Sequence, residues 1–492
     1  MTLILAIDQS TSATKAALFD TSGQIIDRSS REHRQIYPQA GWVEHDAEQI
    51  WQNTIGTIRD LAAKQPGRFK DIAVVSIANQ RETVVVFERS GGKPLHNAIV
   101  WQDRRGDPIC RRIAEQGGEN TVRARTGLKL DTYFSASKLH WLVGERPDLA
   151  RKLRDGDALV GTIDAYLVHR LTGGRVFATD VTNASRTLLF DIEKLRWDEE
   201  LCDLFRVPMK ALPEPREPFA NFGETDAERL LPRKLPICGV LGDSQASFFA
   251  QRCYKPGTAK ATFGTGTSVL FNIGPQRRAS AGGAVTALAW VLRGEPVYAF
   301  EGIINYSAAT LSWLKDQLGL IADVAEAESI ATAVPDNGGV YLVPAFAGLS
   351  APYWRTDARA AILGLTAYSR REHVIRAALE SIAYQVRDVL DMMVKDTGMT
   401  LQRLHADGGP TRNRFLMQFT ADIAQVELCA SDIPEASALG SALAAMLGLG
   451  VHGSLDALAA LRHESRIFKP QLPQQAVQHL RDGWRAAVNR VL

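Results

Sequence analysis

The feature that most constrains this chain is a strand–turn–strand pattern that occurs twice, at the N-terminus and in the middle. The first copy, Leu3–Asp20, reads LILAIDQSTSATKAALFD, with a polar turn at Gln9–Thr14 between two apolar strands. The second copy, Gly257–Phe271, reads GTAKATFGTGTSVLF, with a turn of glycine and hydroxyl residues at Gly264–Ser268. Two such hairpins predict a duplicated fold with a phosphate held between the copies.

Each turn has two interpretations when it is taken alone. In the functional one, backbone N–H groups, hydroxyls and the ammonium of Lys15 bind an anion, while Asp8 holds a cation through water. In the other, the turn is an ordinary hairpin connection made of small polar residues. The first hairpin by itself favours the ordinary turn, so the rest of the chain must decide.

Length, charge and cysteine content narrow the class of protein. A chain of 492 residues exceeds one ordinary hydrophobic core, so two large domains or more are expected. A net charge of +2 argues against a strongly basic nucleic-acid surface. Five scattered cysteines without a CxxC pair predict neither a zinc site nor a disulfide framework. No apolar run approaches the roughly 20 residues of a membrane span, and no signal-peptide pattern is present, so we expect a cytoplasmic protein.

Helical and strand patterns alternate in both halves of the chain. Asp46 is a plausible N-cap for a helix through about Lys64, and Ile72–Ala78 is typical of a fully buried strand. The pattern predicts a helix over Ala158–Leu171 and a polar loop over Thr179–Leu189. The C-terminal half adds a long helix, Arg371–Lys395, that Gly398 ends.

A helix of small residues, Ser437–Leu449 (SALGSALAAMLGL), follows late in the chain. Because its side chains are so small, we expect it to pack tightly against a neighbouring element. A glycine loop, Asp407–Asn413, lies between a strand and a helix, where the backbone can approach a ligand closely.

Charged residues follow two of the expected strands. Arg81 and Glu82 end a buried strand, where α/β proteins place their ligands, and Trp101 could supply an apolar wall. The alternative is a solvated ion pair of no measurable effect. Asp243 lies at a strand-to-helix corner, where either a catalytic base or an N-capping residue is expected, and spacing alone favours the cap.

Together these patterns suit phosphoryl transfer from a nucleotide, with ATP clamped between two domains. Neither a Walker A motif nor a protein-kinase signature is present in the sequence.

At the level of extended motifs the chain resembles the FGGY family of carbohydrate kinases, and within it the glycerol kinases. The resemblance covers nearly the whole length. The segments that carry it are Gln35–Asp46 (QIYPQAGWVEHD), Asn79–Thr83 (NQRET), Asn97–Gln102 (NAIVWQ), Thr182–Thr187 (TNASRT), Tyr341–Trp354 and Leu379–Leu390 (LESIAYQVRDVL), together with family signatures at Tyr133–Glu145 and Ala360–Glu380.

The resemblance implies an α/β, ribonuclease-H-like and actin-like fold in two domains, 1–248 and 249–492, with a deep cleft. It implies ATP and Mg²⁺ as cofactors and Asp8 as the acid associated with the metal. The nucleotide residues that it implies are Thr11, Ser12, Lys15, Thr265, Ala308, Ser312, Gly409 and Asn413. Family members commonly form dimers or tetramers, which makes a homodimer or homotetramer an expectation by analogy.

On the substrate side, the resemblance implies a glycerol pocket formed by Arg81, Glu82, Trp101, Tyr133 and Asp243. Asp243 is then the general base that accepts the proton of a terminal hydroxyl as that hydroxyl attacks the γ-phosphoryl group. Xylulose and gluconate kinases carry a different motif at the Arg81–Glu82 position, so this pair favours glycerol.

Five positions depart from the family pattern. One is Gly144 in the first signature, where a polar residue is usual. Ser244 stands where glycerol kinases have Gln, and Ser268 stands where they have Phe against the glycerol carbons. Both changes remove bulk, which leaves room for a four- or five-carbon polyol or ketose as the alternative substrate. Ser10 replaces a glycine and Lys15 replaces an arginine, so ATP handling could differ. A non-catalytic actin-like nucleotide-binding protein is the other alternative.

Overall fold

The structure is a computed structural model that describes residues 2–431, 433, 435–462 and 465–492. Its contacts divide the chain into two compact units. Unit 1 is 1–252 with 287–298 and 435–462, and unit 2 is 253–286 with 299–434 and 463–492. This division differs from a single boundary after residue 248, because 435–462 pack with the N-terminal half of the chain.

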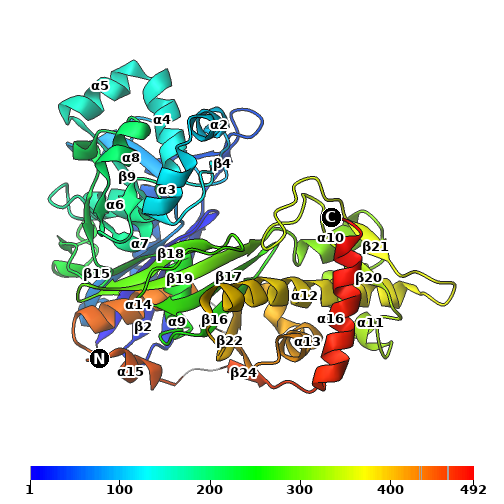
Figure 1. Cartoon of the computed structure of the whole chain (residues 1–492). Coiled ribbons are helices and arrows are strands. Elements are labelled where there is room, and N and C mark those ends of the chain that lie inside the picture. Colours follow the sequence, from blue (N-terminus) through cyan, green and yellow to red (C-terminus); the bar gives the residue numbers. More distant parts are fainter. Residues whose placement is uncertain (1, 432, 434, 463–464) are drawn as a thin grey trace. The chain divides into compact units, whose positions relative to one another are not determined.

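The main sheet of unit 1 has the strand order β14–β15–β6–β1–β2–β3. Its strands β2 and β15 are labelled in Figure 1. Strands β1, β6 and β15 are parallel, and β2 runs antiparallel to both β1 and β3. The strands are β1 (Leu3–Gln9), β2 (Ala13–Asp20), β3 (Ile25–Glu32), β6 (Ile72–Asn79), β14 (Glu224–Thr225) and β15 (Leu235–Gly242).

Unit 2 repeats this topology. In the order β17–β16–β22–β23, strands β16, β22 and β23 are parallel and β17 is antiparallel, as in β2–β1–β6–β15 of unit 1. The duplicated fold predicted from the two hairpins is therefore confirmed. Unit 2 contains β16 (Thr258–Phe263), β17 (Thr267–Gly274), β22 (Arg403–Asp407), β23 (Leu428–Ser431) and β24 (Ser465–Phe468). The chain also contains β18 (Val285–Leu292) and β19 (Glu295–Ile304), whose residues 287–298 belong to unit 1.

Smaller sheets accompany the two main ones. A second sheet of unit 1 contains β4 (Gln35–Ile36), β5 (Glu44–His45), β7 (Val84–Glu88), β8 (Ala98–Ile99) and β9 (Ala158–Thr162). The remaining strands form pairs: β10 (Ala178–Asp180) with β13 (Glu214–Arg216), β11 (Phe190–Asp191) with β12 (Arg196–Trp197), and β20 (Tyr341–Val343) with β21 (Ala361–Leu363).

The helices cover these sheets. Unit 1 contains α1 (Ala47–Lys64), η1 (Phe69–Asp71), α2 (Asp107–Glu115), α3 (Glu119–Thr126), α4 (Ser135–Glu145), α5 (Pro147–Asp155), α6 (Ile163–Leu171), α7 (Val181–Ala184), α8 (Glu199–Leu204), η2 (Met209–Ala211), α9 (Asp243–Ala250), α14 (Ala436–Gly448) and α15 (Leu455–Ala459). Unit 2 contains α10 (Ala309–Asp316), η3 (Val324–Glu326), α11 (Ala327–Thr332), α12 (Arg371–Thr397), η4 (Gly409–Arg412), α13 (Arg414–Ala424) and α16 (Gln474–Asn489). Among the described residues, no helix combines the length and apolar character needed to cross a membrane.

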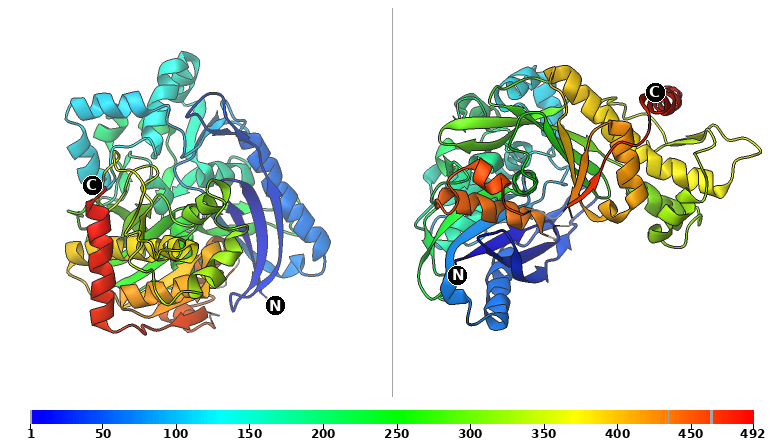
Figure 2. Two further views of the ribbon diagram at one scale, coloured as in Figure 1. Left: turned by 90° about the vertical axis from the view of Figure 1, so that its right-hand side faces the viewer. Right: turned by 90° about the horizontal axis from the view of Figure 1, so that it is seen from below.

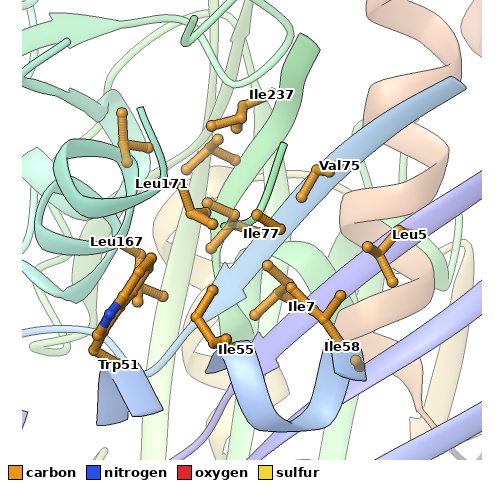
Figure 3. Packing of buried hydrophobic residues seen from close by; sticks show 14 of the residues in the cluster. Leu5, Ile7, Trp51, Ile55, Ile58, Val75, Ile77, Leu167, Leu171 and Ile237 are labelled. Atoms are coloured by element: carbon orange, nitrogen blue, oxygen red, sulfur yellow. The ribbon is translucent and has the colours of Figure 1, made fainter. Parts of the chain in front are cut away.

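Helix α1 shows how sequence pattern becomes packing. The Asp46 side chain accepts hydrogen bonds from the first-turn N–H groups, which confirms the predicted cap. The helix lies along strands β1–β3 (Figure 2). Figure 3 shows Ile55 and Ile58 directed at Ile7 of β1, within one buried cluster. Each fully buried aliphatic side chain of this kind stabilises the fold by roughly 1.5–3 kcal/mol.

Helix α14 packs on the other elements of unit 1 with almost no side-chain layer between them. A Cβ added at Gly440 would lie 1.8 Å from the Ala246 carbonyl oxygen of α9. At Gly239 of β15, where φ is +79°, a Cβ would lie 2.3 Å from the Ser441 oxygen of α14. The prediction that this small-residue helix packs tightly is confirmed, and glycine is required on both sides of the contact.

Two local predictions were wrong in part. The predicted helix Ala158–Leu171 begins as strand β9, because Leu159 and Val160 pair with β7 in a buried sheet, and only then continues as α6. The predicted loop Thr179–Leu189 contains the end of β10 and the short helix α7, whose N-terminus Asp180 caps. Helix α12 and its end at Gly398, where φ is +67°, are confirmed.

Candidate active site

Three parallel strands of unit 1 end side by side. In the sheet register, Asn79 of β6 is the partner of both Gln9 of β1 and Gly242 of β15. The segments that follow these strand ends carry the candidate side chains. Their place at the carboxyl edge of a parallel sheet is where α/β proteins bind ligands.

Arg81 lies between two carboxylates at this edge. Its Nε lies 3.4 Å from Asp243 Oδ1 and 3.8 Å from Glu82 Oε1. The side chains of Arg81 and Glu82 are 5% and 2% exposed, so the interpretation as a solvated surface pair is wrong. Asp243 is 35% exposed, which leaves its carboxylate open to a ligand.

Asp243 is not the N-cap that its spacing suggested. Gly242 occupies the cap position of α9, and Asp243 is the first helical residue. Its Oδ1 accepts a hydrogen bond of 2.6 Å from the Ser244 N–H. A carboxylate paired with a guanidinium and held by a backbone donor has the position and the acceptor capacity that a general base needs.

Two aromatic side chains contact each other in the same unit. The Trp101 and Tyr133 rings lie 5.3 Å apart, so the structure brings these two residues together. The Trp101 indole N–H donates to Thr11 Oγ1 at 3.0 Å, so it is joined to the turn of the first hairpin. The buried ammonium of Lys138 donates to the carbonyl oxygens of Thr132 and Tyr133 and fixes the backbone that carries the Tyr133 ring.

The first hairpin turn is shorter than predicted, covering residues 10–12. Ser10 keeps an ordinary backbone conformation, and its Oγ donates to the Ala13 carbonyl oxygen at 2.9 Å. A serine therefore closes this turn with its own side chain and needs no left-handed geometry. Thr11 and Ser12 occupy the rest of the turn.

Lys15 lies between two acids. Its Nζ lies 2.8 Å from Glu435 Oε2 and 3.9 Å from Asp8 Oδ2. Burial by itself lowers the pKa of Lys15, but the two carboxylates outweigh burial and raise the pKa above its usual value. Lys15 is 31% exposed, so it stays charged while its ammonium remains reachable.

Asp8 has the environment of a ligand for a metal ion. It is 5% exposed, and its Oδ1 has no hydrogen-bond partner among the described residues. Burial raises its pKa to about 7, against the opposing effect of Lys15. No cluster of three or more metal-ligating side chains occurs in the part of the chain that the structure describes. One carboxylate fits Mg²⁺ nonetheless, since this ion is usually held by one or two carboxylates, waters and substrate phosphates.

The second hairpin lies in unit 2 and contacts the start of α10. The Thr265 carbonyl oxygen accepts from Ser307 N–H at 2.8 Å, and the Gly264 carbonyl oxygen accepts from Ala308 N–H at 3.1 Å. Ser312 lies one turn further along α10. The structure thus brings Thr265, Ala308 and Ser312 together.

The late glycine loop packs against the same hairpin. At Gly408, where φ is +98°, a Cβ would lie 1.9 Å from the Phe263 carbonyl oxygen at the end of β16. At Gly409 nothing lies within 4 Å of an added Cβ, so this position is open. Asn413 is the N-cap of α13 and accepts from the Leu416 N–H, which commits its side-chain oxygen to the helix.

The two unusual serines lie in different units. Ser244 follows Asp243 on α9 of unit 1. Ser268 lies on β17 of unit 2, opposite Thr262 on β16. The hydroxyls of both Ser268 and Thr262 are buried and lack hydrogen-bond partners among the described residues.

Two contributors to the site were missed by sequence reasoning. Arg186 donates from Nε to Glu82 Oε1 at 2.6 Å, and Glu435 binds Lys15. Arg186 lies in the family motif Thr182–Thr187, but no pattern in the sequence indicates that it faces Glu82. Glu435 is 420 positions from Lys15, so only the tertiary fold reveals that pair.

Comparisons with known proteins show the family to which the chain belongs. The N-terminal domain of the FGGY family of carbohydrate kinases matches residues 3–250, and the C-terminal domain of that family matches residues 259–449. "Glycerol kinase 1" of Thermotoga maritima is 45% identical over 489 residues, which cover 99% of each chain. "Glycerol kinase" of Desulfitobacterium hafniense is 44% identical over 489 residues, covering 99% of each chain.

Solved structures give the same result. A crystal structure of Plasmodium falciparum glycerol kinase with ADP has a TM-score of 0.96 and 37% identity, covering 100% of this chain and 98% of that one. A ligand-bound xylulose kinase from Lactobacillus acidophilus has a TM-score of 0.88 and 22% identity, with 99% of both chains covered, and shows the shared fold. The mixed α/β architecture in two domains is therefore that of these enzymes, and the chain belongs to the FGGY family of carbohydrate kinases.

Proposed function

We propose that this protein transfers the γ-phosphoryl group of ATP to a terminal hydroxyl of glycerol, giving glycerol 3-phosphate. Relatives named glycerol kinase, at 43–45% identity over essentially the whole chain, support the substrate class. The similar structure that contains ADP supports the nucleotide. The observation that carries the proposal is the contact of Arg81 with both Asp243 and Glu82 at the carboxyl edge of the sheet.

Each of these side chains has a chemical role in the proposed reaction. Asp243 accepts the proton of the attacking hydroxyl, which makes the oxygen a better nucleophile in line with the γ-phosphoryl group. Arg81 donates to, and Glu82 accepts from, the other hydroxyls, so that one end of the polyol is presented. The Trp101 and Tyr133 rings cover the carbon chain.

The ATP-binding residues in the proposal are Thr11, Ser12, Lys15, Thr265, Ala308, Ser312, Gly409 and Asn413. Lys15 places a positive charge beside the first hairpin, and the glycines of unit 2 let its backbone approach a ligand closely. When Mg²⁺ is bound, it neutralises charge on the phosphates. Asp8 would hold that ion, because its Oδ1 is buried and has no protein partner among the described residues.

A second candidate function is the same reaction on a four-carbon polyol. Ser268 favours it, because its buried hydroxyl has no partner in the described part of the chain and could accept a hydrogen bond from an additional substrate hydroxyl. The variant Ser268→Phe restores an aromatic side chain and leaves the acid, the arginine and the hairpins unchanged.

The test measures ADP formation by the purified protein with ATP and Mg²⁺. The acceptor is glycerol, erythritol, threitol or xylulose in turn. The proposal expects glycerol to have the highest kcat/KM. A tetritol that exceeds glycerol by about tenfold, or roughly 1.4 kcal/mol of transition-state preference, would overturn the glycerol assignment. In that case Ser268→Phe should shift the preference back toward glycerol.

A further variant separates a kinase from a non-catalytic nucleotide-binding protein. Asp243→Asn should abolish polyol-dependent ADP formation while ATP binding, measured by calorimetry, stays within about twofold, because the side chain keeps its size and loses its basicity. Asp203→Asn, at an exposed acid of α8, is the matched control and should retain full activity. Undiminished turnover in Asp243→Asn would remove Asp243 from the role of base.

A further inference from the structure

Glu82 is held in a conformation that its sequence does not favour. Its φ is +62°, in the left-handed region, and the residue is 1% exposed. A non-glycine residue in this region costs of order 1–3 kcal/mol unless its surroundings hold it there. Two contacts do so: Ser135 Oγ donates to the Glu82 carbonyl oxygen at 2.8 Å, and Arg186 Nε donates to Glu82 Oε1 at 2.6 Å.

The pair Arg186–Glu82 ends a chain of alternating charges. Asp243, Arg81, Glu82 and Arg186 follow one another with closest nitrogen–oxygen distances of 3.4, 3.8 and 2.6 Å. The exposed fraction of the side chain falls from 35% at Asp243 to 1% at Arg186. The open end of the chain is therefore the proposed base, and the closed end is Arg186.

Arg186 is itself fixed by a buried network. It follows helix α7, whose Asn183 exchanges two side-chain hydrogen bonds with Asn79 at the end of β6, at 2.9 and 3.0 Å. Its guanidinium also lies 5.1 Å from the Phe134 ring. The segment that contains Asn183 and Arg186 therefore contacts both the end of strand β6 and the Glu82 carboxylate. The buried charge of Arg186 is thereby paired with that of Glu82.

We propose that Arg186 is a positioning residue for the phosphoryl acceptor, acting through Glu82 rather than by touching the substrate. Through this hydrogen bond Arg186 holds the Glu82 carboxylate in one orientation, so that Glu82 can recognise a non-reacting hydroxyl of the polyol. This inference rests on the proposed function, because it assigns the recognition of that hydroxyl to a pair of buried residues. Its consequence is a specific loss of hydroxyl discrimination when Arg186 is replaced.

The first experiment compares kcat/KM for glycerol with that for 1,2-propanediol and 1,3-propanediol, each of which lacks one hydroxyl. A site that pairs a substrate hydroxyl with buried polar groups should disfavour an analogue without it by about 10²-fold or more. We expect Arg186→Met to reduce this ratio at least tenfold, mostly through KM for glycerol, and Arg186→Lys to give an intermediate ratio because it keeps charge but not the fork.

The matched control is Arg196→Met, the same substitution at an exposed arginine on β12 of the same unit. It should leave the ratio unchanged. If Arg186→Met lowers kcat/KM equally for all three acceptors, Arg186 supports the fold alone and the proposal is overturned.

The second experiment does not depend on turnover. Thermal denaturation of the ligand-free wild type, Arg186→Met, Glu82→Gln and the double variant measures the coupling of the two side chains. Loss of one partner leaves a buried charge and should lower the midpoint by about 5 °C or more, whereas the double variant should recover part of that loss. Additive effects would overturn the pairing even if no polyol is phosphorylated, while coupling with no turnover would refute the proposed function alone.

Discussion

The two hairpins occupy the same place in a duplicated topology but carry different chemistry. The second cross-strand pair, counted outward from the turn, occupies the equivalent position in the two hairpins. This pair is Asp8–Lys15 in unit 1 and Thr262–Ser268 in unit 2. The Asp8–Lys15 pair is charged, and Lys15 also binds Glu435. The Thr262–Ser268 pair consists of two buried hydroxyls with no partner among the described residues. The duplication therefore preserved the backbone and assigned the charges to one copy.

The turns differ in the same direction. The first is closed by the Ser10 hydroxyl, while the second depends on glycine, because a Cβ at Gly266 would lie 2.4 Å from the Ile304 carbonyl oxygen. One turn can present side-chain charge, and the other can present bare backbone close to a ligand. Equal topology thus carries two chemically different turns, and this contrast can be tested residue by residue.

The largest expected effect is that of removing charge from the first hairpin. Asp8→Asn should lower kcat by about 10²–10³-fold, because it removes the carboxylate that we propose as the ligand of the divalent cation. The measurement is turnover as a function of Mg²⁺ concentration. The equivalent change in unit 2, Thr262→Val, removes a hydroxyl without a described partner and should alter kcat less than about threefold. Comparable losses of kcat in the two variants would show that the two hairpins do not differ in this way.

The next effect should come from adding bulk to the second turn. Gly266→Ala places a Cβ against backbone oxygens of residues 304 and 305, so the turn must shift, and we expect KM for ATP to rise about tenfold. Initial rates over a range of ATP concentrations give the value. Gly264→Ala is the control, because its nearest atom lies at 3.5 Å, an ordinary contact. If Gly266→Ala behaves like this control, the second turn does not depend on close approach.

A pH effect should separate the hairpins as well. His33 contacts the Thr11 carbonyl oxygen, and its ring lies 4.7 Å from that of His45. Burial lowers the pKa of His45 to about 3, and burial also lowers the pKa of His33. The stability that neutral His45 contributes is complete above its ordinary pKa of 6.5 and is lost as pH falls from there toward 3. Neutral His33 loses stability in the same direction, because its pKa is also lowered by burial.

At pH 5 the loss of folding stability from His45 reaches about 2 kcal/mol. Amide hydrogen exchange, corrected for its intrinsic pH dependence, should therefore accelerate up to about 30-fold at residues 9–14. Exchange at residues 263–267 should change little. Equal acceleration in both turns would indicate global destabilisation rather than a property of the first hairpin.

The smallest expected effect is that of the turn serine. Ser10→Gly removes the side-chain hydrogen bond to Ala13 and adds backbone freedom to the unfolded chain, at a cost of about 1 kcal/mol. The thermal midpoint should fall by a few degrees at most, with KM for ATP changed less than about threefold. A larger change in KM would show that the Ser10 side chain shapes ATP binding beyond closing the turn.

Much of the fold was accessible from local pattern. The Asp46 cap, the buried strand β6 and the glycine end of α12 each depend on residues within a few positions of one another, so short-range chemistry decides them. The prediction of helix at strand β9 fails because a short apolar run is compatible with both helix and strand. Pairing with the distant strand β7 decides between them.

The candidate site divides in the same manner. Asp8, Arg81 and Asp243 could be proposed because each directly follows or ends a strand that the pattern predicts. The contacts that tune them could not, because Glu435 and Arg186 reach Lys15 and Glu82 across 420 and 104 positions of sequence. Hydrophobic periodicity specifies which face of an element is buried, and it contains no information on which distant charge will lie opposite.

By itself, the sequence determined the duplicated hairpins, the alternation of helices and strands, and the residue types available for phosphoryl transfer. Tertiary structure alone decided that α14 returns to unit 1, that Lys15 is shared by two acids, and that a strained Glu82 is held by Arg186. The physical reason is the distance along the sequence over which each kind of interaction acts. Turns, caps and periodicity act over a few residues, whereas the pairing of buried charges is settled only when the sheet aligns its strand ends.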